Sequence, residues 1–150
     1  MEKDVYIHWD ALYSINIEKI DEQHKKWFQI LNNFYKAFKK GQGQLFVMGT
    51  LKEFFDYTQY HFAEEEKLFK KYNYPQMDAH IKTHKQLIWE ITHMYNETGN
   101  NNIILSLKTI ELLKDWLIKH ILTLDKAFGE FVRQSKNEST NKSKNSTKGT

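Results

Sequence analysis

Hydrophobic residues recur at intervals of three and four along most of the chain, which is the spacing of one face of an α-helix. The pattern predicts four helices of similar length, over residues 17–40, 44–72, 75–97 and 103–133. Gly, Asn and the single Pro stand in the short segments between them, at 41–43, 73–75 and 98–101. Four such helices with short connections favour an all-α, antiparallel up-down-up-down four-helix bundle.

The predicted inward faces of these helices contain polar residues as well as apolar ones. In the second helix this face contains Leu51, Phe54, Thr58, His61, Glu65, Leu68 and Tyr72. In the third it contains Met77, His80, His84, Leu87, Ile91 and Met94, and in the fourth Ile110, Leu113, Leu117, His120, Leu124 and Phe128. Because an unpartnered polar group costs several kcal/mol when it is buried, these groups are expected to meet partners inside the bundle.

The two ends of the chain differ from the bundle of residues 18–133. Residues 1–17 lack the helical period and are predicted to form an extended arm that Tyr6, Trp9 and Tyr13 pin to the bundle. Residues 134–150 are rich in Ser, Thr, Asn and Lys and are predicted to be a disordered polar tail. The last fifteen residues account for the whole net charge of +3, so the basic balance does not indicate a nucleic-acid surface on the bundle.

Composition excludes several classes of protein. The chain has no cysteine, which rules out disulfides, thiolate metal sites and cysteine nucleophiles. No apolar run approaches the length of a membrane span. The N-terminal sequence MEKDVYIHWD has no apolar core of a signal peptide, so a cytoplasmic protein is expected.

Seven polar residues are predicted to meet at one level of the bundle: His24, His61, Glu65, His80, His84, His120 and Asp125. Counted at about 1.5 Å per residue, each lies roughly 7–20 Å from the same end. The pairs His61/Glu65 and His80/His84 are four apart and therefore share a helix face. His120 and Asp125 are five apart, about 140° around an ideal helix, and are expected to reach a shared site from opposite flanks.

Five imidazoles and two carboxylates exceed the needs of one tetrahedral zinc ion. They fit two octahedral ions that share both carboxylates, one ion with three imidazoles and the other with two and an open position. Imidazole and carboxylate donors without thiolate favour iron, and an open position on a redox metal indicates a small-molecule ligand.

Other polar residues are expected to have secondary roles or none in this site. His8 and His93 fall outside the pattern, and His93 is expected to be exposed. Glu64 and Glu66 are expected on a solvated face with neighbouring lysines. The candidates for orienting the imidazoles through their second nitrogen are Gln23, Tyr57 and Gln59.

The chain resembles the hemerythrin family from about Trp9 to Phe131. The motifs that carry the resemblance are Asp21-Glu22-Gln23-His24, His61-x-x-x-Glu65, His80-x-x-x-His84, Asp115-Trp116-Leu117 and His120-x-x-x-x-Asp125. The resemblance implies a non-haem di-iron centre with an oxo or hydroxo bridge. It also implies the ligands: His80, His84 and His120 on one iron, His24 and His61 on the other, and Glu65 and Asp125 bridging both.

The resemblance further implies that oxygen binds reversibly at the iron with two histidines, in a pocket that excludes water. By their position beside the ligands, the expected pocket residues are Trp27, Phe62, Trp116, Leu117 and Ile121. Trp27 is bulkier than the leucine or isoleucine common at this place in the family, and is expected to restrict access.

The function that follows is a binding protein, not an enzyme, for oxygen carriage, storage or delivery, with a protein that receives the oxygen left open as a partner. The alternatives are a di-iron oxidase or peroxide-scavenging enzyme, a sensor of oxygen or nitric oxide, and iron storage. Ferritin-like oxidases use carboxylate-rich sites with Glu-x-x-His pairs, so a donor set made mostly of imidazoles favours reversible binding.

Overall fold

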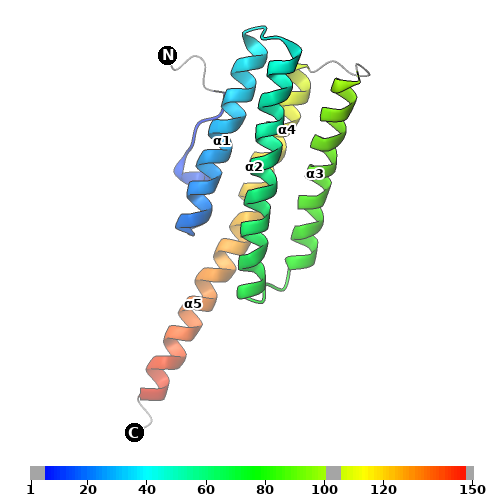
Figure 1. Ribbon diagram of the computed structural model, residues 1–150. Coiled ribbons are helices and arrows are strands. Elements are labelled where there is room, and N and C mark those ends of the chain that lie inside the picture. Colours follow the sequence, from blue (N-terminus) through cyan, green and yellow to red (C-terminus); the bar gives the residue numbers. More distant parts are fainter. Residues whose placement is uncertain (1–5, 101–105, 148–150) are drawn as a thin grey trace.

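The computed structural model describes residues 6–100 and 106–147. In this part of the chain four helical rods pack side by side and alternate in direction (Figure 1). The first three are α1 (Glu18–Lys39), α2 (Gln44–Lys71) and α3 (Met77–Gly99). The fourth rod consists of α4 (Leu107–His120), the π-helical segment η3 (Ile121–Asp125) and α5 (Lys126–Thr147). The predicted up-down-up-down four-helix bundle is confirmed.

The turns follow the residues that the sequence places between the helices. Asn73 adopts a left-handed conformation with φ +50°, which Asn tolerates better than most residues, and α3 begins two residues after Pro75. The expected start of the fourth helix at residue 103 lies outside the described residues. The described helix begins at Leu107, and the side chain of Ser106 caps it by accepting a hydrogen bond from the Thr109 backbone N–H.

The sequence predicts one uniform α-helix for the fourth rod, and the structure differs. Over Ile121–Asp125 the backbone takes a π-helical turn, in which hydrogen bonds join residues five apart instead of four. Residues five apart therefore lie on one face at this place. The expectation that His120 and Asp125 approach a site from opposite flanks is wrong, because the wider turn brings the His120 Nε2 and an Asp125 carboxylate oxygen within 3.2 Å.

Two apolar clusters lie on either side of the polar level. The larger cluster fills the half of the bundle with the α1–α2 connection and includes Leu31, Phe54 and Ile91. The smaller one, Phe69, Tyr74, Phe128 and Val132, closes the end with the α2–α3 turn. Along each helix the seven polar residues fall between these clusters, so apolar side chains cover them from both ends.

The N-terminal arm runs along the outside of α1 and contains one short 3₁₀ turn, η2 (Ala11–Tyr13) (Figure 1). The Asn32 side chain accepts hydrogen bonds from the backbone N–H groups of Tyr6 and Ile7, at 3.0 and 2.8 Å, and donates one to the Ile7 carbonyl. The Asp21 carboxylate accepts from the Ile15 backbone N–H at 2.8 Å. Two polar side chains of α1 thus hold the arm at both of its ends.

Aromatic rings fill the space between the arm and α1. Tyr6 stacks on Tyr35 with ring centroids 4.1 Å apart, while Trp9 and Tyr13 both pack against Phe28. These contacts agree with the packed arm that the sequence predicts; residues 1–5 of it lie outside the described residues.

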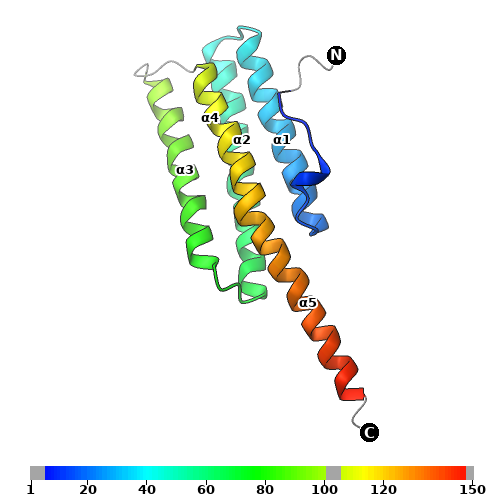
Figure 2. The ribbon, with the colours of Figure 1, turned by 180° about the vertical axis from the view of Figure 1, so that it is seen from behind.

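The C-terminal part of α5 continues the fourth rod beyond the bundle, in the direction of the α2–α3 turn (Figures 1 and 2). No side chain over 134–140 is buried, as expected for the polar tail. The backbone of α5 is helical to Thr147. Residues 130–147 contain neither glycine nor proline, so no strong helix breaker ends the helix earlier.

In the described part of the chain no helix has the length and apolar content to span a bilayer.

A substitution at Gly129 can test the contact between the arm and the fourth rod. A Cβ at this position would lie 2.2 Å from the backbone oxygen of Ile15, so the arm would have to shift. We expect Gly129→Ala to lower the free energy of unfolding by about 1–3 kcal/mol, measured by urea denaturation. Gly49→Ala is the matched control, because it is exposed on α2 with nothing within 4 Å of an added Cβ, and should raise it by about 0.5–1 kcal/mol. Equal stability of Gly129→Ala and the native chain would contradict this packing.

Candidate metal centre

The structure brings the seven predicted donor residues together in the interior, each with at most 5% of its surface exposed. They form two groups, and within each group one donor atom from every residue lies within 4.8 Å of the others. The first group consists of Glu65, His80, His84, His120 and Asp125. The second consists of His24, His61, Glu65 and Asp125. The two carboxylates belong to both groups.

The two oxygens of each carboxylate face different groups of imidazoles. Glu65 Oε1 lies 3.0 Å from His80 Nε2 and 3.3 Å from His84 Nε2, whereas Oε2 lies 3.4 Å from His61 Nε2. Asp125 Oδ1 lies 2.9 Å from His80 Nε2, and Oδ2 lies 3.2 Å from the Nε2 atom of His24. Together the two carboxylates therefore span from His80, His84 and His120 on one side to His24 and His61 on the other.

Backbone geometry accounts for this convergence. His61 and Glu65 on α2 are four residues apart, as are His80 and His84 on α3, so each pair points from one helix face. His120 and Asp125 come from the two ends of the π-helical turn, which aligns residues five apart. Three rods therefore contribute two donors each, and α1 contributes one.

Many donor atoms of this cluster lack a hydrogen-bond partner. In the described part of the chain both oxygens of Glu65 and of Asp125 are buried without one, as is the Nε2 atom of His24, His61 and His84. Buried polar atoms are nearly always satisfied, and leaving them unsatisfied costs free energy. A pair of cations between the two sets of imidazoles would satisfy all of these atoms, so the residues present fit a metal centre.

The protonation of the cluster shows how charge is balanced inside it. Burial lowers the pKa of His61 to about 3, with nearby His24 adding to the effect, so this imidazole is neutral. Burial also opposes the charged form of His80, but Asp125 and Glu65 outweigh it and raise the pKa of His80 to about 9. Burial acts against both carboxylates, yet the surrounding histidines lower the pKa of Glu65 and hold that of Asp125 well below its usual range. The carboxylates are thus ionised, and protons on imidazoles balance them.

Residues around the cluster orient its imidazoles. The Oε1 atom of Gln23 lies 2.8 Å from His61 Nδ1, so that Nδ1 carries the proton and Nε2 faces Glu65. The Tyr57 hydroxyl donates to the Gln23 backbone carbonyl at 3.0 Å and fixes the segment that carries this glutamine. Gln23 and Tyr57 are two of the three sequence candidates for this role, whereas the third, Gln59, is exposed.

Glu66 differs from the sequence expectation. Glu64 is partly buried and pairs with Lys19 and with the neighbouring Lys67. Glu66, in contrast, has one carboxylate oxygen 3.8 Å from His84 Nδ1, the nitrogen that points away from Glu65. Burial opposes the charged form of His84, but Glu65 and then Glu66 outweigh it and raise the pKa of His84. Glu66 follows Phe62 by one helical turn on α2, and this spacing places it beside the buried face.

Aromatic rings enclose the imidazoles. Phe62 stacks on His84 with centroids 3.7 Å apart and an interplanar angle of 5°, and Trp116 stacks on His120 at 4.4 Å and 11°. Trp27 is fully buried and contacts both His24 and His61. The two remaining pocket candidates, Leu117 and Ile121, are fully buried in the same apolar core as Trp27 and Phe62.

The sequence does not predict two contacts of this enclosure. The indole N–H of Trp27 donates to Thr58 Oγ1 at 2.9 Å, so Trp27 turns no free donor toward the imidazoles. Phe69 packs against His80 and His84, at 4.5 and 6.1 Å, although the predicted inward residue at this level is Leu68, which is only partly buried. Phe69 follows Glu65 by four residues, just as Glu65 follows His61. Continuing this spacing by one helical turn would have placed Phe69 on the buried face.

The two histidines left out of the pattern lie elsewhere. His93 is exposed, as predicted, and stacks on Trp89 on the outer face of α3. His8 is exposed on the N-terminal arm.

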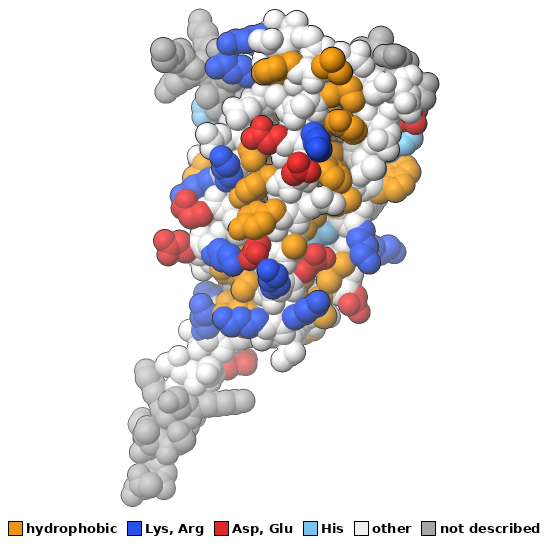
Figure 3. All heavy atoms as spheres, viewed as in Figure 1, with side chains coloured by type: hydrophobic (Ala, Val, Ile, Leu, Met, Phe, Trp, Pro, Cys, Tyr) orange, Lys and Arg blue, Asp and Glu red, His pale blue; other side chains and the backbone are white. Residues whose placement is uncertain are grey.

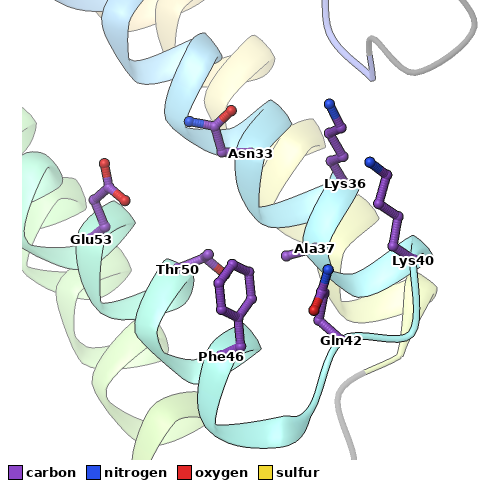
Figure 4. A pocket seen from close by; sticks show the side chains of 8 residues that line it. All are labelled: Asn33, Lys36, Ala37, Lys40, Gln42, Phe46, Thr50 and Glu53. Atoms are coloured by element: carbon purple, nitrogen blue, oxygen red, sulfur yellow. The ribbon is translucent and has the colours of Figure 1, made fainter.

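A surface groove of about 370 Å³ lies between the C-terminal end of α1 and the start of α2 (Figure 4). Lys36, Lys40, Phe46 and Thr50 line it, and the first three are exposed. Lys36 is twelve residues from His24, about 18 Å along α1, so the groove is separate from the donor cluster. No residue of the cluster lines it.

Comparison with known proteins agrees with the fold and the motifs. The family model described as the hemerythrin HHE cation binding domain matches residues 16–132. A bacteriohemerythrin of Stenotrophomonas maltophilia is 30% identical over 131 residues, covering 87% of this chain and 84% of that protein. A hemerythrin subunit of Sipunculus nudus is 29% identical over 117 residues, covering 78% and 86%. In fold, the chain is similar to the crystal structure of wild-type hemerythrin, with a TM-score of 0.77 and 25% identity over 83% of this chain and 96% of that one.

The raised pKa of His80 predicts that metal binding releases a proton from it. At pH 7.5 a group with a pKa of about 9 is protonated, and it must lose that proton to become a ligand. We expect His80→Asn to release roughly one proton fewer than the native chain when metal-free protein binds Co²⁺, measured by calorimetry in buffers of different ionisation enthalpy.

His61→Asn is the matched control, because it also removes one imidazole but one that is already neutral. It should weaken Co²⁺ binding while leaving proton release close to that of the native chain. Equal proton release by the two variants would show that His80 does not hold the proton.

Proposed function

The chain belongs to the hemerythrin family, and on this premise we propose that the cluster binds two iron ions and, through them, molecular oxygen reversibly. The observation that carries the proposal is the division of the carboxylate oxygens between three imidazoles and two. His80, His84 and His120 would hold one ion and His24 and His61 the other. Glu65 and Asp125 would bridge both, with an oxo or hydroxo group between the ions. Donors of this type, without thiolate, suit iron.

The unequal sharing of donors supports a ligand-binding role. Three imidazoles and two carboxylate oxygens would hold one ion. Only two imidazoles and two oxygens would hold the other, which would leave that ion an open position beside His24 and His61. When bound, a pair of ferrous ions supplies the electrons that an oxygen complex requires. Oxygen would take the open position.

The side chains around His24 and His61 would keep this position dry. Trp27 and Phe62 contact the imidazoles with hydrocarbon surface, and the Trp27 N–H is already occupied by Thr58. With Trp116, Leu117 and Ile121, these side chains form the proposed oxygen pocket. Exclusion of water favours reversible binding, since water and protons promote loss of the reduced ligand. The bulk of Trp27 would narrow access to small ligands.

A binding role is favoured over an oxidase because the site is built mostly from imidazoles, whereas ferritin-like oxidases use carboxylate-rich sites.

On the face seen in Figure 3, acidic and basic side chains alternate with apolar ones and form no broad basic area, so this face does not suggest a nucleic-acid partner. Oxygen carriage, storage, delivery or sensing would all use the same site. A cytoplasmic location and a protein that receives the oxygen stay predictions from the sequence.

His120→Ala should abolish stable binding of the ion that three imidazoles hold, because it removes one of them. We expect iron content to fall from about two to about one equivalent or less per chain, measured by elemental analysis after gel filtration. His93→Ala removes an exposed histidine and should leave the iron content unchanged. Two equivalents of iron in His120→Ala would contradict the proposed ligand set.

Reversible oxygen binding can be tested directly on protein loaded with ferrous iron under anaerobic conditions. Admitting air should produce a visible charge-transfer band, and removing oxygen under vacuum should abolish it, over repeated cycles. A single irreversible conversion to a ferric spectrum would indicate oxidase chemistry and contradict a carrier.

A further inference from the structure

We propose that Trp116 is the route by which electrons reach the metal centre from a one-electron donor at the protein surface. The inference rests on the proposed function and adds a step to it. A pair of irons that binds oxygen in the ferrous state stops binding once both ions are oxidised. Two one-electron transfers restore it: each ferric ion gains one electron, each donor loses one, and no bond of the protein forms or breaks.

Burial prevents a donor from touching the cluster itself. The seven donor residues are at most 5% exposed, and apolar clusters cover them at both ends. Among the described residues, four rings contact the imidazoles closely: Trp27, Phe62, Phe69 and Trp116. The first three are buried, so an electron donor at the surface cannot contact them.

Trp116 differs from these three rings because it is partly exposed. It lies on α4, which faces the viewer in Figure 2, and Leu112, one turn earlier on the same face, is 61% exposed. This stretch of α4 is therefore at the surface of the bundle. A donor can approach the indole from outside while the other side of the ring contacts the site.

The geometry of the inner contact suits electron transfer. The rings of Trp116 and His120 are nearly parallel, at 11°, with centroids 4.4 Å apart, so their π systems overlap. His120 would in turn be bonded to the ion that three imidazoles hold. The path from the surface to the metal then contains one gap through space, between two stacked rings.

The test compares the rate at which diferric protein is reduced by reduced methyl viologen, followed by stopped flow. We expect Trp116→Leu to slow reduction about tenfold, equivalent to about 1.4 kcal/mol of activation free energy, and Trp116→Phe, which keeps a ring, to slow it less. Trp89→Leu is the control, because Trp89 is 65% exposed and stacks on His93, away from the donor cluster. The diferric Trp89→Leu variant should be reduced at the native rate.

Iron content and midpoint potential separate a route from a structural effect. Both should be unchanged in Trp116→Leu, because a route alters the rate and not the equilibrium. Bound iron with a native reduction rate in Trp116→Leu, or a slower rate with an equally altered midpoint potential, would overturn this inference alone. A native chain that binds no iron would overturn the proposed function as well.

Discussion

Two buried carboxylates shared by five imidazoles are the constraint on which the rest of the structure depends. Glu65 and Asp125 are fully buried, and each directs its two oxygens at different histidines. Such an arrangement is costly in an apolar interior unless positive charge is nearby. Protons on imidazoles supply that charge in the metal-free chain, and a pair of cations would supply it permanently. The bundle encloses the cluster in an apolar interior, which favours the exchange of these protons for metal ions.

The helices set the donors at this level with little adjustment. Pairs four apart on α2 and α3 require only ideal helix geometry, and apolar clusters above and below hold the rods in register. The fourth rod needs more, since its two donors are five apart. A single π-helical turn there brings both side chains to the same face, and such turns are frequent at functional sites.

The sequence predicted the bundle, the arm and the seven residues that converge, because periodicity and spacing depend on positions along the chain alone. It failed at η3, where ideal helix geometry placed Asp125 about 140° from His120. Local propensity does not encode such a turn; the need of both side chains to reach one site selects it. The same limit applies to Phe69 and Glu66, whose contacts depend on how helices rotate against one another. Ring stacking, such as that of Trp116 on His120, is likewise visible only once α4 is placed.

The arm contributes no donor, yet it borders the π-helical segment of the fourth rod. Its turn η2 lies beside η3, and the Ile15 carbonyl rests against Gly129, one turn beyond Asp125. Residues 6–17 therefore serve as a brace for the segment that carries two of the donors. A minimal domain cut at the first residue of α1 would keep every ligand and still lose this brace. The functional domain thus includes more of the chain than the helices that carry the donor residues.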